Sequence, residues 1–350
     1  MKKVLVFIVM ISILLTSCST KDNKADYFDG EYFTYINENG KRIPAKLNPA
    51  TGNITSFCND PLCDHGAECP FYNYFGGWAD GDRIYYIADD FIGEVSIRYY
   101  EISTGHVFLL AVPEHEPEGG YIFTDKYIYY AYREIDSLNL LRRCRVDKKS
   151  GKQVFIERTW YDTGLRIWDG KNIYIAEPRG IVRYDEDLNN EKVLNENPCA
   201  NLTDCGEYIY FTTNSGICRI HKRSLQSELI YSCEKMILLT AINNDAEGEI
   251  FFLTEQDEPA VIGKYFDGSN VPDTFGNKLY HLNKDGSVSI TEINIPEKSD
   301  GKHFISYIEG TAGSYVLLKC GYISSDFQFT SRFSLISVNV VTGECLLIDM

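Results

Sequence analysis

One short phrase that recurs along the chain constrains its fold more than any other feature. The phrase starts with a small or acidic residue and usually a glycine, and it ends in an aromatic-rich run, as in Asp80-Gly81-Asp82-Arg83-Ile84-Tyr85-Tyr86. Seven such phrases are marked by Gly30, Gly81, Asp125, Gly170, Gly206, Gly248 and Gly313. The marks lie 36 to 65 residues apart, about 47 on average, which is typical of propeller blades.

A second set of turns is offset from the first and follows β-type runs. These turns are Asn48–Gly52, Ser103–Gly105, Asp147–Gly151, Asn283–Gly286 and Val341–Gly343. Glycine supplies the positive φ that closes a hairpin, so each repeat is predicted to hold four strands. In the third repeat we expect strands at Tyr121–Phe123, Tyr127–Tyr132, Leu140–Val146 and Gln153–Glu157.

The repeats predict an all-β chain that forms a single β-propeller, with seven four-stranded blades, over residues 29–350. The long last interval contains a loop at about residues 255–276, so six or eight blades remain alternatives. A row of independent β-sandwich domains is the competing architecture. The aromatic content of 13% agrees with β structure in either case.

The first residues have the pattern of an export signal. Lys2 and Lys3 precede an uncharged stretch of twelve residues from Val4 to Leu15, and Thr16-Ser17-Cys18 follows it. Twelve helical residues rise about 18 Å, short of the ~30 Å hydrocarbon core, so a spanning anchor is not favoured. The ending resembles the bacterial lipobox, and this resemblance implies cleavage before Cys18 and a lipid on its thiol. An ordinary signal peptide ending in cysteine is the alternative.

We therefore predict a lipoprotein signal peptide at residues 1–17 and a lipidated cysteine with a flexible tether at residues 18–28. The chain would then be exported and anchored by lipid to the cell membrane, facing outside. Its 34 basic and 50 acidic residues give a net charge of −16. This charge repels phosphate backbones and excludes nucleic acid as a partner.

Cys58, Cys63, His65 and Cys69 place three thiols and an imidazole within twelve residues, which are enough donors for a tetrahedral zinc site. Their spacing differs from that of common zinc knuckles, and the Cys-x-His step requires a sharp bend. A disulfide within this segment is the alternative, because ten cysteines remain after Cys18 and an even number suits an exported chain. Free thiols are a third alternative.

Further disulfides are conceivable in the blades. Cys218 and Cys233 fall on consecutive expected strands, where pairing about the turn near Ser224 sets residue 218 opposite 231 and allows a diagonal bridge. Two more candidate pairs are Cys199 with Cys205 and Cys320 with Cys345.

Two resemblances concern the propeller family. The runs 84–89 and 208–213 resemble the YWTD-type strand of low-density-lipoprotein-receptor-like propellers. The run Cys58–Phe71 is similar to the Cys-x-Asp-Pro-x-Cys-x-His insert, followed by Cys-Pro, of bacterial surface lipoproteins known as DUF5050-like. This resemblance implies a receptor-like propeller at the cell surface with a Cys-rich insert at residues 57–72, and it carries no established activity.

The sequence contains no Gly-x-Ser-x-Gly elbow, phosphate-binding loop or His-Glu-x-x-His motif, so it identifies no catalytic residues. The acidic run from Asp185 superficially matches a calcium loop, but Asn190 replaces its glycine, and we predict a hairpin turn. Trp78 and Trp168 lie near turns, where they would either face a ligand in the channel or pack between blades.

The sequence favours a non-catalytic binding or scaffolding propeller for a polymer, peptide or protein. One alternative is a surface hydrolase or lyase that acts on glycans at the propeller channel. The other is a metal-binding or redox-sensing surface protein that works through the Cys-rich insert.

Overall fold

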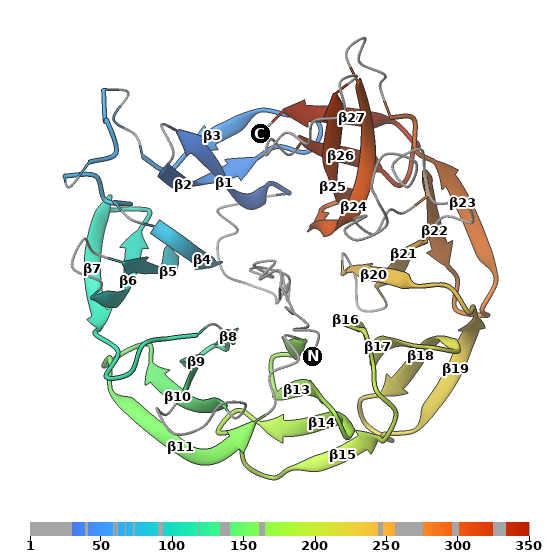
Figure 1. Ribbon diagram of the computed structural model, residues 1–350, viewed down its shortest axis with the longest axis horizontal. Helices are drawn as coiled ribbons and strands as arrows, with labels where there is room; N and C mark the ends of the chain where they lie inside the picture. Colours follow the sequence, from blue (N-terminus) through green and yellow to red (C-terminus); the bar gives the residue numbers. More distant parts are fainter. Residues whose placement is uncertain are drawn as a thin grey trace, which may run out of the picture.

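A computed structural model describes residues 30–38, 41–58, 60, 62–66, 68–72, 74–89, 94–118, 120–133, 141–160, 165–243, 248–255, 276–295, 301–324 and 334–349. These residues form seven antiparallel sheets arranged around a central axis (Figure 1). The predicted seven-bladed propeller is confirmed, in place of six or eight blades or separate sandwiches. The predicted signal, Cys18 and the tether lie outside the described residues.

The sheets are numbered here as blades in chain order. Blade 1 has three described strands, β1 (Tyr32–Glu38), β2 (Lys41–Leu47) and β3 (Ile54–Ser56). Blade 2 contains β4 (Tyr74–Asp80), β5 (Arg83–Asp89), β6 (Val95–Glu101) and β7 (His106–Ala111). Blade 3 contains β8 (Ile122–Phe123), β9 (Tyr127–Arg133), β10 (Leu141–Asp147) and β11 (Gln153–Trp160), close to the four predicted strands.

The remaining blades each have four strands. Blade 4 contains β12 (Arg166–Trp168), β13 (Asn172–Glu177), β14 (Gly180–Asp185) and β15 (Lys192–Asn195). Blade 5 contains β16 (Asn201–Cys205), β17 (Tyr208–Thr213), β18 (Gly216–His221) and β19 (Ser227–Ser232). Blade 6 contains β20 (Ile237–Ile242), β21 (Glu249–Thr254), β22 (Lys278–Leu282) and β23 (Val288–Glu292). Blade 7 contains β24 (Gly301–Ala312), β25 (Tyr315–Ser324), β26 (Ser334–Asn339) and β27 (Cys345–Asp349).

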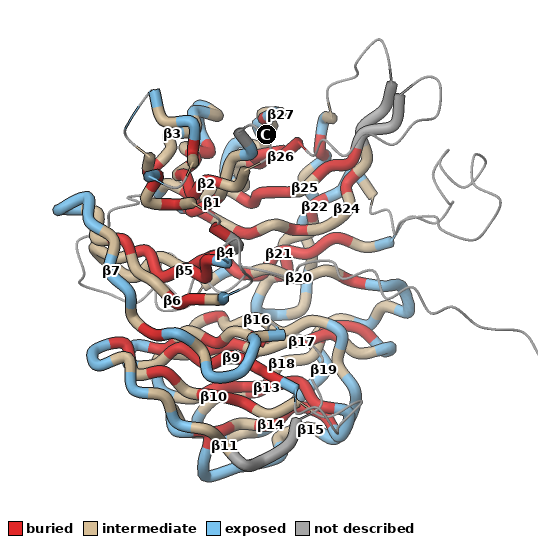
Figure 2. Tube along the Cα trace, turned by 60° about the vertical axis from the view of Figure 1, so that its left-hand side comes forward, coloured by how far each residue is buried: buried red, intermediate tan, exposed pale blue. Residues whose placement is uncertain are grey.

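In blades 2 to 7 the aromatic run of the repeat forms the second strand and is buried on both faces, whereas in blade 1 it forms β1, the first described strand. In β5, every residue from Ile84 to Ala88 is buried (Figure 2). Tyrosine suits this place because its ring fills the core while its hydroxyl reaches a polar group. Tyr130 donates to Oε1 of Gln153 at 2.9 Å, and Tyr174 donates to Oδ2 of Asp169 at 3.0 Å.

The turn predictions also hold. Gly81 and Gly170 have φ values of 58° and 84°, as the turns before the second strands require. The supposed calcium loop is a hairpin turn in which Oδ1 of Asp185 accepts the backbone N–H groups of Asp187 and Asn189. The carboxylate therefore stabilises the turn itself, as an Asx turn does.

The hydrophobic core is divided among the contacts between consecutive blades. One cluster, for example, joins Phe251 and Leu253 of blade 6 to Ile305, Val316 and Leu318 of blade 7. Each described sheet is built from consecutive strands, so the ring closes by packing of blade 7 against blade 1. The stability of the propeller therefore depends on the packing of every blade against a neighbouring blade on each side.

The closing contact is centred on Tyr32. Its ring is 6% exposed and packs with Leu47 and Leu317, and its hydroxyl donates to the carbonyl of Glu309 at 3.0 Å. Across the contact, a Cβ at position 310 would lie 2.7 Å from a ring atom of Tyr32, so Gly310 makes room for the ring. The last and first blades thus interlock through one aromatic side chain.

Replacing Tyr32 tests this closure. Tyr32→Phe removes only the hydroxyl and should lower the free energy of unfolding by about 1 kcal/mol. Tyr32→Ala removes the ring from the contact and should lower it by about 3–5 kcal/mol. Urea unfolding monitored by fluorescence measures both. A loss below about 1 kcal/mol for the alanine variant would show that the ring closes without this contact.

Candidate functional site

The Cys-rich insert leaves blade 1 after β3 and enters blade 2 at β4, at the periphery of the ring (Figure 1). Both blades hold it. Lys41 donates to the carbonyl of His65 at 2.7 Å, and Tyr86 donates to the carbonyl of Pro70 at 2.7 Å. The Phe71 ring is fully buried, with its centroid 4.8 Å from that of Tyr100. The insert is therefore anchored on either side of its cysteines.

The four predicted ligands come together. One ligand atom from each of Cys58, Cys63, His65 and Cys69 lies within 4.8 Å of the others. The sulfurs of Cys58 and Cys69 are 3.8 Å apart, and Nδ1 of His65 is 3.4 Å from Sγ of Cys69. Tetrahedral zinc with its usual bond lengths requires about 3.8 Å between two sulfurs and about 3.6 Å between sulfur and nitrogen. These two distances fit one metal ion.

Local backbone structure creates this convergence. His65 has a φ of 55°, in the left-handed region, which makes the sharp bend that the Cys-x-His step requires. Turns closed by Cys63 N–H to Asp60 C=O at 3.1 Å and by Cys69 N–H to Gly66 C=O at 2.9 Å bring in the other ligands. A left-handed non-glycine residue is unfavourable, and such residues concentrate at functional sites.

The ligands lie in a partly buried environment. His65 and Cys69 are buried, at 3% and 5% exposure. Burial raises the pKa of the Cys69 thiol to about 12 and also raises the pKa of Cys58. A bound divalent cation would supply the positive charge that thiolates need here. Four protein ligands would leave no open position, as is usual for structural rather than catalytic metal centres.

The disulfide hypotheses are not confirmed, because the structure shows no disulfide among the ten described cysteines. A β-bulge changes the register after Ile217, so Cys218 faces Leu229 and Cys233 lies beyond the end of β19. Cys320 lies on β25 and Cys345 on β27, with β26 between them. Strands spaced about 4.8 Å apart place such residues out of disulfide reach.

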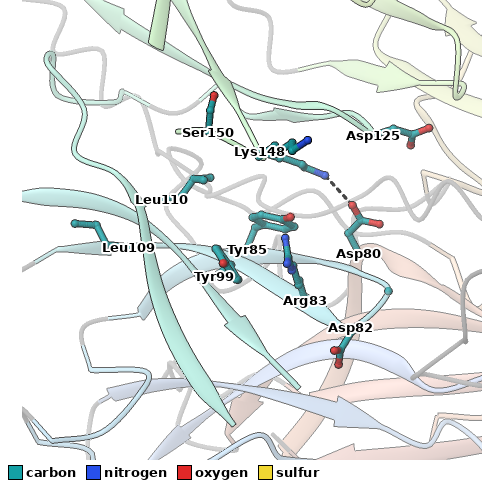
Figure 3. Close-up of a pocket in the computed structure, with 12 residues that line it drawn as sticks. Asp80, Asp82, Arg83, Tyr85, Tyr99, Leu109, Leu110, Asp125, Lys148 and Ser150 are labelled. Atoms are coloured by element: carbon teal, nitrogen blue, oxygen red, sulfur yellow. Dashed lines mark hydrogen bonds and ion pairs between the residues drawn. The ribbon is translucent and has the colours of Figure 1, made fainter. Parts of the chain in front are cut away.

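A second candidate site is a groove between blades 2 and 3, shown in Figure 3, with a volume of about 730 Å³. Tyr85 and Tyr99 form its wall, and Leu109 and Leu110 of β7 lie at its side. The remaining lining consists of turn residues and charged groups, Asp80, Gly81, Asp82, Arg83, Asp125, Lys148, Lys149 and Ser150. No sequence motif marks this groove, because its residues come from strands of blade 2 and from turns of blades 2 and 3 that are far apart along the chain.

The charges of the groove are balanced. Three acidic and three basic side chains line it, and several are paired. Lys148 is 6% exposed, and its Nζ lies 2.9 Å from Oδ2 of Asp80 and 4.7 Å from the centre of the Tyr85 ring. Arg83 lies 4.6 Å from the centre of the Tyr99 ring. The groove therefore offers donors and acceptors without a strong field of either sign.

The two singled-out tryptophans contact neighbouring blades. Trp168 is 4% exposed and belongs to the cluster between blades 3 and 4. Trp78 stacks on Phe123 of blade 3, with ring centroids 5.3 Å apart, and Lys148 lies 4.3 Å from the centre of its ring. These contacts are those of packing between blades, and a ligand-facing role for either residue stays a prediction.

Glu309 on β24 is a third unusual group that the sequence did not indicate. Its Oε2 is buried, with no hydrogen-bond partner among the described residues. Burial raises the pKa of this carboxyl, and a hydrogen bond from Tyr307 and the charge of Lys319 oppose the shift. Lys319 itself donates to the Tyr307 hydroxyl at 2.9 Å, and burial lowers the pKa of Lys319. Glu309 differs from other carboxylates in the burial of its side chain, which results from packing in blade 7, so the sequence carries no signal for it.

Comparison with protein-family models gave no match, and comparison with curated proteins gave none either. The fold is similar to that of solved structures. An oligogalacturonate lyase in complex with manganese is 14% identical over 83% of this chain and 82% of that chain, with a TM-score of 0.54. An oligogalacturonate lyase from Vibrio parahaemolyticus is 12% identical over 85% and 88%, with a TM-score of 0.55.

A puromycin-hydrolysing peptidase from Mycobacterium tuberculosis is 9% identical over 91% of this chain and 51% of that chain, with a TM-score of 0.55. At such identities the likeness shows the propeller fold alone. No helix in the described part of the chain meets the length and apolarity needed to cross a bilayer.

Replacing Glu309 by glutamine should flatten the pH dependence of stability. A pKa raised in the folded chain means that the stability linked to the bound proton is complete below about pH 4.3, the ordinary value for Glu, and is lost as the pH rises through the raised value. The free energy of unfolding of the wild type should therefore fall relative to that of E309Q across this window. Urea unfolding at about pH 4 to 8 measures the difference.

The exposed Glu234 provides a matched control, because Glu234→Gln removes a carboxylate that the fold does not bury. Parallel pH profiles for the wild type and E309Q would show that Glu309 ionises as freely in the folded chain as in the unfolded one.

Proposed function

We propose that the protein is a binding propeller, anchored outside the cell membrane by a lipid on Cys18, that holds a hydroxyl-rich glycan segment in the groove between blades 2 and 3. The balanced charge of that groove carries the proposal. A ligand without net charge can form hydrogen bonds with such a lining, and it does not have to break the ion pairs within it. The cavity volume is within the about 300–1,000 Å³ of small-ligand sites.

The groove lies against the hydrophobic cluster between blades 2 and 3, which includes Tyr85, Tyr99 and Leu110 of its lining. Its walls come from rigid strands and its rim from the turns at Asp80–Asp82 and Lys148–Ser150. Binding residues are commonly carried on loops that a rigid scaffold holds in place. Saccharides are also the substrates named for two of the similar propellers, which agrees with a glycan ligand.

We further propose that the Cys-rich insert holds a structural zinc ion. Cys58, Cys63, His65 and Cys69 provide a donor set and two measured separations that suit zinc. Bound zinc would neutralise the thiolates and fix the insert between blades 1 and 2. The ion would stabilise structure without meeting a substrate.

A second candidate function is that of a glycan hydrolase or lyase at the channel. The specific observation that favours it is Glu309, a carboxyl with a raised pKa on the first strand of its blade. Groups of this kind act as general acids in many enzymes. Turnover of a polysaccharide that is lost in E309Q would support this function over binding alone.

The binding proposal predicts a difference between two exposed leucines. Leu109 on β7 lines the groove and is 63% exposed, whereas Leu229 on β19 is 51% exposed and is not among the groove residues. Leu109→Asp adds an unbalanced charge to the groove and should weaken glycan binding about tenfold, or 1.4 kcal/mol. Leu229→Asp should leave binding unchanged.

Affinity electrophoresis of the full chain in mild detergent, through gels that contain neutral glucans, mannans or galactans, measures the binding. Polygalacturonate serves as the acidic comparison. If none of the neutral polysaccharides retards the protein, or if both aspartate variants bind equally, the groove is not a glycan site.

The zinc proposal predicts about one zinc per chain in protein purified without chelator. Cys63→Ser and His65→Ala should each lower the bound zinc at least about tenfold, because each removes one of four ligands. Cys233→Ser, which changes a cysteine in another blade, should not. Elemental analysis of the purified chain gives the content, and a wild type free of metal under these conditions would refute the site.

A further inference from the structure

We propose that Cys58 and Cys69 form a reversible disulfide pair that releases the metal when a small cationic disulfide enters the cavity beside the centre. This inference rests on the zinc centre proposed above and goes beyond it, because it makes the centre a site of thiol modification. Three observations carry it: the separation of the two sulfurs, the access to one of them, and the charge around the opening.

The two sulfurs are already close. Sγ of Cys58 and Sγ of Cys69 are 3.8 Å apart, so bond formation at about 2.05 Å requires a small movement of two side chains. Two cysteine sulfurs at this separation can bind one metal ion, and at the same separation they can also form a disulfide after a small movement. The two alternatives that the sequence left open, metal ligation and disulfide formation, are therefore two states that the same residues can adopt.

A cavity of about 430 Å³ leads to the centre. Cys58 and Cys63 line this cavity, whereas Cys69 is 5% exposed and is not part of the lining. A small reagent can thus reach Cys58, while Cys69 is placed to attack the mixed disulfide that forms there. This arrangement of an accessible and a sheltered thiol is that of an attacking and a resolving cysteine.

The opening is acidic. Asp60, Asp64 and Glu68 line the same cavity as the two cysteines. The carboxylates attract cations and repel anions, so they favour the arrival of a metal ion or a cationic disulfide over an anionic disulfide. The surrounding charge of the chain, −16 in total, acts in the same direction.

The chemistry balances with a small disulfide as the oxidant. The Cys58 thiolate attacks one sulfur of the disulfide, its S–S bond breaks, and one small thiolate leaves. The Cys69 thiolate then attacks Sγ of Cys58 and expels the second small thiolate. Two protein thiolates are oxidised to one disulfide, the reagent is reduced to two thiolates, and the metal, left with Cys63 and His65, is released. A dithiol reductant reverses both exchanges.

The rest of the fold should persist through this change. Lys41 holds the carbonyl of His65 and Tyr86 holds that of Pro70, and neither hydrogen bond involves a sulfur. Phe71 is buried against blade 2 in a cluster that includes Cys69, and a disulfide would leave Cys69 in that cluster. The new bond would still join the two ends of the insert. Only the bend at His65 and the side chain of Cys63 would become free to move.

Cystamine, a cationic disulfide, provides the test on the full zinc-loaded chain in mild detergent. We expect stoichiometric zinc release, followed with a chromophoric chelator, together with a Cys58–Cys69 link in the peptide map, and reversal by dithiothreitol and zinc. Oxidised glutathione, which is anionic, should act at least about tenfold more slowly at low salt, and added salt should narrow the difference. Glu68→Gln, which removes one carboxylate from the opening, should also reduce the difference in rate between cystamine and oxidised glutathione.

Controls separate this inference from the zinc proposal. Cys69→Ser should accumulate a mixed disulfide at Cys58, whereas Cys144→Ser, in the core of blade 3, should behave as the wild type. Zinc measured before cystamine is added tests the metal centre alone. Zinc that stays bound under cystamine, a link between other cysteines, or equal rates for the two disulfides would overturn the inference.

Discussion

Packing of each blade on both of its neighbours is the constraint on which the rest of this structure depends. A blade with one exposed face would leave its aromatic second strand in water, so no blade is stable alone. The ring must therefore close, and it does so through side chains. Tyr32 of blade 1 occupies the space that Gly310 of blade 7 leaves open, and its hydroxyl satisfies the carbonyl of Glu309. Closure buries β1 and β24 together and completes the core.

The candidate sites lie at connections between strands, one in the insert between blades 1 and 2 and the other at the turns of blades 2 and 3. The Cys-rich insert follows β3, the last described strand of blade 1. It is anchored through two backbone carbonyls and the buried ring of Phe71, and Cys69 belongs to the hydrophobic cluster between blades 1 and 2. The groove opens where the turns of blades 2 and 3 meet, around the buried pair of Lys148 and Asp80. A rigid ring with variable connections allows binding chemistry to differ without a change of fold.

Local signals in the sequence were reliable wherever the structure is itself local. Glycine turns and the aromatic runs that follow them predicted the second strands, because a turn needs only a few adjacent residues. The four candidate metal ligands were also visible, since Cys58 to Cys69 fall within one short loop. The conceivable bridge between Cys218 and Cys233 is not confirmed, because a bulge after Ile217 shifts the register and no residue type marks that shift.

The sequence by itself favoured seven blades and indicated the place of the insert and the four side chains that could hold a metal, because repeat length and short loops depend on neighbours along the chain. Only the tertiary structure decided that Lys148 pairs with Asp80 in a groove, that Oε2 of Glu309 is buried, and that Cys58 and Cys69 bring their sulfurs within 3.8 Å. Burial and charge at these positions come from other strands and blades. Such contacts have no fixed spacing in sequence, so they appear only when the ring has closed.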